Sequence, residues 1–216
     1  HRHSSAASDV YKRQVTSSMD TALEPLRLAN GPIIKSVTNL DGPPGIESQQ
    51  DADSAALQVI NIIKRNNSAD AFVIACFSDP GIYAAREVTN KPVFGIAESG
   101  ILTALSLGSS FGILAILDTS VPRHVRYIRS LGLEKRFAGD LAIGLGVAEL
   151  SDEKKTFHRL LEVGRKLRDN HESSVLILGC AGMARYRHDL QESLGIPVVD
   201  PSQAAVSMAV YAVLLN

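Results

Sequence analysis

A repeat of about 104 residues constrains this chain more than any other sequence feature. Short apolar runs, typical of buried parallel strands, alternate with stretches of helical periodicity. The predicted strands are Ile33–Thr38, Ala71–Cys76, Pro92–Ile96, Phe111–Leu117, Phe137–Ile143, Ser174–Cys180 and Ile196–Asp200. The predicted helices include Asp51–Asn66, Val121–Leu131, Glu153–Asn170 and Ser202–Leu215. This alternation predicts an α/β fold with parallel sheets flanked by helices.

Elements of the first half recur in the second half at a nearly constant spacing. A shift of 104 positions places Ile33–Thr38 on residues 137–142 and the helix at 51–66 on residues 155–170. The same shift places Cys76 on Cys180, and it places Pro92 within one residue of Pro197. The order of the elements therefore predicts two pseudo-symmetric lobes, each a parallel sheet flanked by helices.

The repeat predicts a first strand that the N-terminal residues do not supply. The second half opens with Phe111–Leu117, whose counterpart falls near residues 7–13, and these read Ala-Ser-Asp-Val-Tyr-Lys-Arg. We expect the first strand to be missing or replaced, and we interpret residues 1–14 as a tag, a linker or non-native sequence. The segment lacks the apolar stretch of a signal peptide, so a cytoplasmic location is expected. The expected domains are lobe 1 at 15–98, lobe 2 at 99–200 and a helix at 201–216 that returns to lobe 1.

Composition excludes several classes of function. Lys and Arg number 22 and Asp and Glu 23, which argues against a nucleic-acid binder because such a protein needs a basic stripe. No apolar run approaches the length of a membrane span, so no membrane partner is expected. Two cysteines cannot build a disulfide scaffold. The histidines lack metal-ligand spacing and the glycines lack a dinucleotide fingerprint. We expect a small-molecule ligand, and neither a metal nor another cofactor.

The two cysteines occupy equivalent places in the repeat. Cys76 and Cys180 each end an apolar strand and precede a turn and a helix. A lone buried cysteine is usually a small hydrophobic residue. Ligands of open α/β sheets bind outside the carboxyl ends of the strands, however, and the pairing would aim two thiols at one cleft. One thiolate can remove a proton from a carbon acid while the opposite thiol returns one, which is the chemistry of a racemase.

Several motifs resemble the aspartate/glutamate racemase superfamily, most closely its hydantoin racemase branch. They are Ala75-Cys76-Phe77-Ser78-Asp79-Pro80-Gly81, Pro92-Val93-Phe94-Gly95-Ile96-Ala97-Glu98, Leu178-Gly179-Cys180-Ala181-Gly182-Met183-Ala184, Val37-Thr38-Asn39 and Gly42-Pro43-Pro44-Gly45-Ile46-Glu47. The resemblance spans about residues 15–212. It implies two flavodoxin-like lobes with the active site between them, Cys76 and Cys180 as catalytic residues, and no metal or pyridoxal phosphate. It also implies a 5-substituted hydantoin as the substrate, with allantoin used by related enzymes.

The resemblance is incomplete at the N-terminus. The family's first strand ends in Asn-Pro-Asn-Thr, and only Thr16-Ser17 remains of that region here. A carbanion beside a carbonyl needs preorganised donors for the enolate oxygen. The candidate substrate-binding residues are Thr16, Ser17, Phe77, Ser78, Thr119, Ser120, Ala181 and Gly182. The alternatives are a local turn bond for Ser78 and helix capping for Thr119 and Ser120.

Other polar residues have more ordinary interpretations. Asp79 is predicted to cap the helix that opens at Pro80-Gly81 and to raise the pKa of Cys76. Glu98 is interpreted as a solvated first-turn carboxylate, with orientation of a substrate nitrogen as the alternative. Arg185 is expected on a solvated helix face. His124 and His188 lie among arginines and are expected to be exposed.

Three functions remain open from the sequence. The first is a hydantoin-type racemase. The second keeps the same proton chemistry on allantoin, aspartate or glutamate. The third is a two-lobed binding protein without catalysis, which the fold alone permits. A homo-oligomer is also expected, with the helix at 121–131 as its candidate interface.

Overall fold

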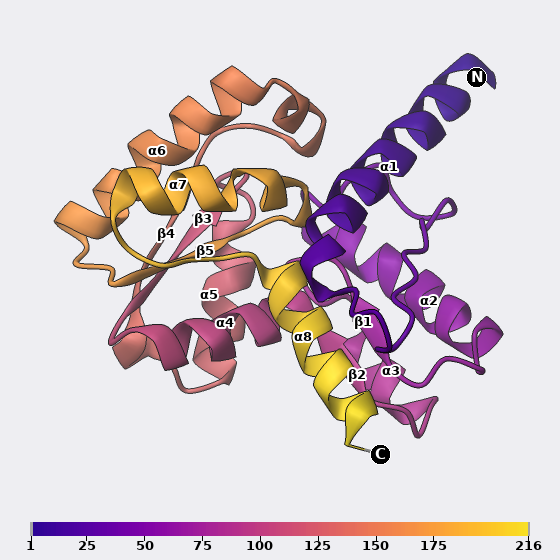
Figure 1. The fold of residues 1–216 in the computed structure, drawn as a ribbon. Helices are drawn as coiled ribbons and strands as arrows, with labels where there is room; N and C mark the ends of the chain where they lie inside the picture. Colours follow the sequence, from indigo (N-terminus) through magenta and orange to yellow (C-terminus); the bar gives the residue numbers. More distant parts are fainter. Residues whose placement is uncertain (1, 216) are drawn as a thin grey trace.

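The structure is a computed structural model that describes residues 2–215, with side chains from residue 12 onward (Figure 1). Residues 1 and 216, the ends of two expected segments, lie outside the described residues. The helices are α1 Arg2–Ala22, α2 Gln49–Arg65, α3 Ile82–Glu87, α4 Ile96–Leu107, α5 Val121–Ser130, α6 Glu153–Asn170, α7 Arg187–Leu194 and α8 Pro201–Leu214. The strands are β1 Phe72–Ile74, β2 Val93–Gly95, β3 Phe111–Ala115, β4 Phe137–Ala142, β5 Val175–Leu178 and β6 Val198–Val199. Short 3-10 turns are η1 Glu24–Leu26, η2 Glu134–Arg136, η3 Val147–Ser151 and η4 Ala181–Tyr186.

The larger sheet has the strand order β4-β3-β5-β6, and all of its pairings are parallel. Helices α6 and α7 cover one face, and α4 and α5 cover the other (Figure 1). Successive residues of β3 alternate between these layers, with Ile113 packed toward α4 and Leu114 toward α6. Both side chains are fully buried, and each such burial contributes about 1.5–3 kcal/mol. Burial on both faces explains why the strands are continuous apolar runs.

The smaller sheet reproduces part of the larger one. Strands β1 and β2 pair in parallel, with Phe72 opposite Val93. Strands β5 and β6 pair in the same way, with Leu176 opposite Val198. The paired positions are separated by 104 and 105 residues, the spacing that the sequence predicts. The prediction of an α/β fold with two pseudo-symmetric parallel sheets is therefore confirmed.

The predicted strand Ile33–Thr38 is wrong, because the structure has no ladder there among the described residues. Its counterpart β4 pairs only with β3. The counterpart of β3 in the first half would fall at residues 7–13, which are helical and belong to α1. Residues 33–38 therefore lack the neighbour with which they would pair. They stay extended, and their side chains alternate between exposed and half-buried.

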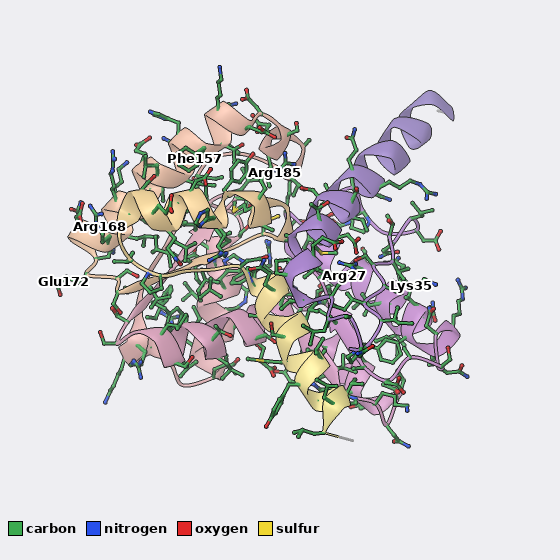
Figure 2. All side chains as sticks on the ribbon, viewed as in Figure 1. Arg27, Lys35, Phe157, Arg168, Glu172 and Arg185 are labelled. Carbon is green, nitrogen blue, oxygen red and sulfur yellow. The ribbon has the colours of Figure 1, made fainter. Side chains whose placement is uncertain are left out.

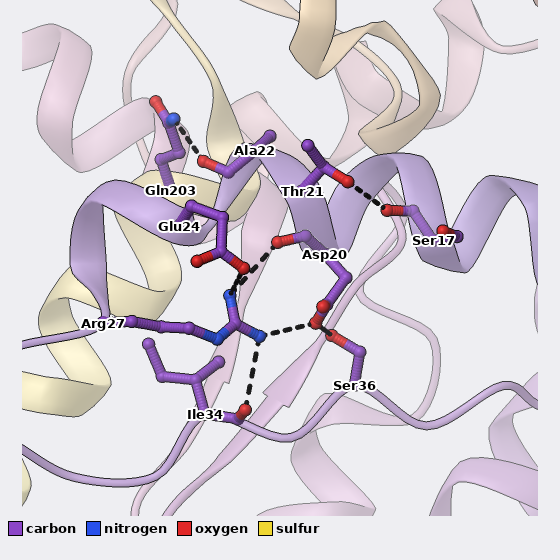
Figure 3. Close-up of polar contacts among 9 residues, drawn as sticks. All are labelled: Ser17, Asp20, Thr21, Ala22, Glu24, Arg27, Ile34, Ser36 and Gln203. Atoms are coloured by element: carbon purple, nitrogen blue, oxygen red, sulfur yellow. Dashed lines mark hydrogen bonds and ion pairs between the residues drawn. The ribbon is translucent and has the colours of Figure 1, made fainter.

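Helix α1 holds this extended segment through side-chain bonds (Figure 3). Ser36 Oγ donates to Asp20 Oδ1 at 2.5 Å, and Arg27 Nη2 donates to the same oxygen at 2.8 Å. Thr38 Oγ1 donates to Thr16 Oγ1 at 3.0 Å. These bonds fix the segment against α1 without the regular ladder of a sheet.

Helix α8 joins the two sheets. Asp200 caps it by accepting the Ser202 N–H at 3.0 Å, and Pro201 takes the first helical position, as the sequence predicts. The helix packs against α4 as well as β1 and β2, and Gln203 Nε2 donates to the Ala22 carbonyl of α1 at 2.7 Å (Figure 3). No helix in the described part of the chain is both long and apolar enough to cross a membrane.

Candidate active site

The two cysteines lie at equivalent strand ends. Cys76 follows β1 and Cys180 follows β5, so both stand beyond the carboxyl ends of parallel strands. Both are free and half-buried. A negative charge on Cys180 would oppose ionisation of Cys76, so the two thiols lie within electrostatic range of each other. The repeat predicts that both thiols face one cleft.

The chain makes the same turn after each cysteine. The Asp79 N–H donates to the Cys76 carbonyl at 2.9 Å, and the Met183 N–H donates to the Cys180 carbonyl at 3.1 Å. The backbone N–H of the residue two positions after each cysteine hydrogen-bonds the sulfur when it is a thiolate. This residue is Ser78 for Cys76 and Gly182 for Cys180. The pseudo-symmetry therefore extends to the donors around each sulfur.

Both thiols favour the protonated form. Burial raises the pKa of Cys76 to about 12 and that of Cys180 to about 11. The amides of Ser78 and Gly182 partly offset this rise because they stabilise the thiolates. The carboxylate of Asp79 further opposes the thiolate of Cys76, as the sequence predicts, and the Arg123 guanidinium favours it.

These raised pKa values predict how alkylation depends on pH. Because the thiolate is the reacting form, iodoacetamide should modify both cysteines about tenfold faster per pH unit between pH 7 and pH 10. Neither rate should level off in that range, since both pKa values lie above 10. Peptide mass spectrometry with glutathione as the reference thiol measures the two rates. A plateau below pH 9 at either cysteine would contradict this expectation.

Asp79 caps a different helix from the predicted one. Gly81, in the left-handed conformation, stands at the N-terminus of α3. The Asp79 carboxylate instead accepts the N–H groups of Ala97 and Glu98, both at 2.9 Å, at the start of α4. The carboxyl group lies directly against Gly95, where a Cβ atom would come within 2.2 Å of Asp79 Cγ. The cap comes from a turn far away in sequence, so local patterning does not reveal it.

Glu47 links the loop before α2 to the second half of the chain. Its Oε1 atom accepts the Val147 N–H at 2.9 Å. Its carbonyl accepts Thr119 Oγ1 at 2.9 Å and Arg123 Nη1 at 3.3 Å. The negative charge of Glu47 also raises the pKa of Cys180, although burial has the larger effect. The loop is thus fastened beside the site by three bonds that cross between the two halves.

A charge-removing substitution tests the influence of Glu47 on Cys180. Glu47→Gln keeps an oxygen for the Val147 N–H and removes the negative charge. Alkylation of Cys180 at pH 8 should become about two- to fivefold faster because its pKa falls. Cys76 is the internal control, and its rate should stay constant. Equal acceleration of both cysteines would indicate general loosening of the structure instead.

The candidate substrate-binding hydroxyl groups have different hydrogen-bond partners. Ser120 is buried, and its Oγ atom accepts Arg123 Nη2 at 3.3 Å without capping α5. The Thr119 hydroxyl is exposed and bonded to Glu47. On α1, Thr16 Oγ1 donates to the Lys12 carbonyl at 3.1 Å.

Ser17 faces a shallow surface hollow. Its side chain lines this hollow together with Arg185 of η4, which is labelled in Figure 2. Helix α1 packs against η4, the turn that follows Cys180. Arg185 is exposed, as expected. Its Nη1 atom also forms an ion pair with Glu153 at 2.8 Å.

The candidates next to the cysteines are mostly buried. Phe77, Ala181 and Gly182 are buried, and Ser78 is half-buried. The Phe77 ring packs against α4 and β3 residues, and its edge-to-face contact with His124 spans 5.1 Å between centroids. Among these four, the backbone amides of Ser78 and Gly182 reach the sulfur atoms.

Two polar residues differ from their predicted environments. His124 is buried, with 6% exposure, and its Nδ1 lies 2.7 Å from Asp140 Oδ2. His124 precedes Tyr127 and Ile128 by three and four residues, so it lies on the inner face of α5. The neighbouring arginines obscured this spacing in the sequence. Glu98 is not a freely solvated carboxylate, because it pairs with Arg86 at 2.9 Å and accepts Tyr127 Oη at 3.4 Å. His188 is exposed, as predicted.

Sequence reasoning gave no role to Asp140 or Arg123. Asp140 lies within β4, and the sequence pattern there indicates only a strand. Arg123 lies in the first turn of α5, and only the folded chain brings it toward Cys76. Among the described residues, no three His, Cys, Asp or Glu side chains gather in a way that could hold a metal ion.

Two thiols at equivalent sheet ends form a site suited to acid–base chemistry on a small molecule. Residues 13–209 match the sequence profile of the Asp/Glu/Hydantoin racemase family. The chain is 37% identical to the hydantoin racemase of Pseudomonas sp. (strain NS671) over 171 residues, covering 78% of this chain and 69% of that protein. It therefore belongs to the Asp/Glu/hydantoin racemase family and is an isomerase.

Solved structures agree with this assignment. The allantoin racemase from Klebsiella pneumoniae superposes with a TM-score of 0.84 at 31% identity, covering 93% of this chain and 83% of that one. The allantoin racemase from Pseudomonas fluorescens superposes with a TM-score of 0.89 at 26% identity, covering 94% and 87%. The fold is thus shared with known racemases.

Proposed function

We propose that the chain racemises a 5-substituted hydantoin at C5, without a cofactor, through Cys76 and Cys180. Allantoin, which is 5-ureidohydantoin, falls within this class. The observation that carries the proposal is the pair of half-buried thiols at equivalent strand ends, each with a backbone amide two positions further on. The similarity to hydantoin racemases and allantoin racemases supports the choice of substrate.

The proposed reaction moves two protons on opposite faces of one carbon. One thiolate forms an S–H bond with the C5 proton, and the electron pair of the C–H bond passes into the enolate of the C4 carbonyl. The opposite thiol then gives its proton to C5 and becomes a thiolate. One proton leaves the carbon and one returns, so the two cysteines have exchanged their protonation states. A thiol with a raised pKa yields a strong base once it is ionised.

The enolate oxygen needs donors that are in place before the proton moves. The half-buried Ser78 and the amide-rich turn at Ala181 and Gly182 flank the two sulfur atoms. Arg123 adds a positive charge on the Cys76 side, held there by its bonds to Glu47, Thr119 and Ser120. We assign these groups the role of stabilising the developing negative charge.

A substrate panel tests the proposed function. Single enantiomers of 5-substituted hydantoins, allantoin, aspartate and glutamate are incubated with the protein, and optical rotation is followed. We expect the rotation of hydantoins to decay to zero, with the amino acids unchanged. Activity on aspartate or glutamate alone would overturn the choice of substrate. Ligand binding without any loss of rotation would favour a binding protein.

A further inference from the structure

Each half of the chain places one buried carboxyl group at the same point of its sheet. Gly95 ends β2 and Asp200 follows β6, and these two positions are separated by the 105 residues that relate β2 to β6. Gly95 has no side chain, but the Asp79 carboxyl group fills the space beside it, with Cγ 2.2 Å from where a Cβ atom would stand. Asp79 itself corresponds to Met183 in the repeat. The two carboxyl groups therefore reach equivalent places from positions that are not equivalent in sequence.

The two carboxyl groups also accept equivalent backbone hydrogen bonds. Asp79 accepts the N–H groups of Ala97 and Glu98, both at 2.9 Å, in the first turn of α4. Asp200 accepts the N–H group of Ser202 at 3.0 Å in the first turn of α8. Ala97 and Ser202 are each the second residue of their helix, and α4 and α8 pack against each other (Figure 1). One carboxyl group thus caps the same helix in each half.

Helix capping alone does not explain an aspartate at both places. Serine, threonine and asparagine cap helices as well, and a carboxylate costs more to bury. Asp79 and Asp200 are only 4% and 2% exposed. Asp79 also has a φ of 42°, a backbone conformation that is unfavourable for most residues other than glycine. Asp200 Oδ2 is buried without a hydrogen-bond partner among the described residues. These costs indicate that the negative charge has a role besides the cap.

Each carboxylate lies within electrostatic range of the cysteine in its own half. The charge of Asp79 opposes ionisation of Cys76, and the charge of Asp200 opposes ionisation of Cys180, although burial has the larger effect on both. In the proposed reaction the two cysteines exchange protonation states at each turnover. A carboxylate beside only one cysteine would favour the thiolate on the other side. A carboxylate beside each of them balances the two states.

We propose that Asp79 and Asp200 form a matched pair of positioning residues, each of which holds the cysteine of its own half as a thiol while the opposite cysteine is the thiolate. The inference rests on the proposed function, because it assumes that the two cysteines exchange their protonation states. It assigns Asp200 a role that the repeat does not reveal, since the residue at the corresponding position of the first half is a glycine.

A pair of charge-removing substitutions tests this inference. Asp79→Asn and Asp200→Asn each remove one charge and keep an oxygen for the helix cap. At pH 8 the ratio of the Cys180 to the Cys76 alkylation rate should rise about threefold in Asp200→Asn and fall about threefold in Asp79→Asn. Asp79→Ser and Asp200→Ser, which also cap without a charge, replace any asparagine variant that does not fold. An unchanged ratio, or a change in the same direction in both variants, would overturn the assignment.

The pH dependence separates the charge of Asp200 from its cap. Burial raises the pKa of Asp200 to about 6, while the charge of Arg187 favours its ionised form. Glu47 is a second carboxylate that opposes ionisation of Cys180, and it is unchanged in this variant. The effect of Asp200→Asn on Cys180 should therefore be full at pH 8 and shrink towards zero at pH 5, where Asp200 itself is protonated. Dithiodipyridine, which reacts with thiols at low pH, measures both rates.

An effect that stays constant from pH 5 to pH 8 would show altered access to the sulfur and would overturn the assignment. Thiol modification needs no turnover, so this test and the proposed function can fail separately. Absence of racemisation would count against the proposed function, and the modification rates would still decide whether the two aspartates act on the two thiols.

Discussion

Replacing either Cys76 or Cys180 by serine is expected to abolish racemisation in both directions. The serine hydroxyl fills nearly the same space, but it is far less acidic than a thiol and cannot serve as the base. Because racemisation needs one group on each face of C5, each substitution should lower kcat by roughly 10³-fold or more. Polarimetry with both enantiomers of one hydantoin measures the loss.

The surviving cysteine gives this prediction a second readout. Each single variant should still exchange the C5 proton of one enantiomer with solvent, since one base remains on one face. Cys76→Ser and Cys180→Ser should therefore exchange opposite enantiomers, as proton NMR in deuterium oxide would reveal. Circular dichroism confirms that each variant is folded. Full two-way activity in either variant would contradict the two-base mechanism.

Gly95→Ala is expected to destabilise the protein by about 3 kcal/mol or more. The new Cβ would stand 2.2 Å from Asp79 Cγ, so the carboxyl group must leave its place. Its departure would free the N–H groups of Ala97 and Glu98 at the start of α4. For a chain of this length, such a loss lowers Tm by about 6–12 °C. Urea denaturation and thermal melting measure the change.

The Asp79→Gly background supplies the matched control. Without the carboxyl group, Gly95→Ala meets no clash there and should cost about 0.5 kcal/mol or less. The difference between the two backgrounds measures the coupling between Gly95 and Asp79. The same cost in both backgrounds would show that the clash is relieved by another route.

The repeat made most of this fold predictable from the sequence. Parallel strands buried on both faces must be apolar throughout, so their positions stand out in the chain. The segment at 33–38 carries the same pattern, but a strand also needs a neighbour. Its neighbour would fall at residues 7–13, which are helical here. A local pattern thus predicts that a segment tends to form a strand. It does not show whether a neighbouring strand is present for it to pair with.

The cysteines were found because two independent patterns, strand ends and the repeat, coincide on them. The groups around them were harder to predict. Asp79 caps a helix that begins 17 residues later, at Ile96, and Glu47 bonds a backbone amide 100 positions away. His124 pairs with an aspartate inside a neighbouring strand. These contacts depend on tertiary packing, which spacing along the chain does not encode.

Deuterium incorporation during the first turnovers tests the two-base account most directly. A single enantiomer of a 5-substituted hydantoin is converted in deuterium oxide, and substrate and product are separated on a chiral column. The two-base mechanism predicts deuterium at C5 of the product and protium at C5 of the remaining substrate. The hydrogen that C5 receives comes from the thiol opposite the base, and this thiol carries deuterium from the solvent. Protium retained in the product, or equal labelling of both enantiomers from the start, would contradict it.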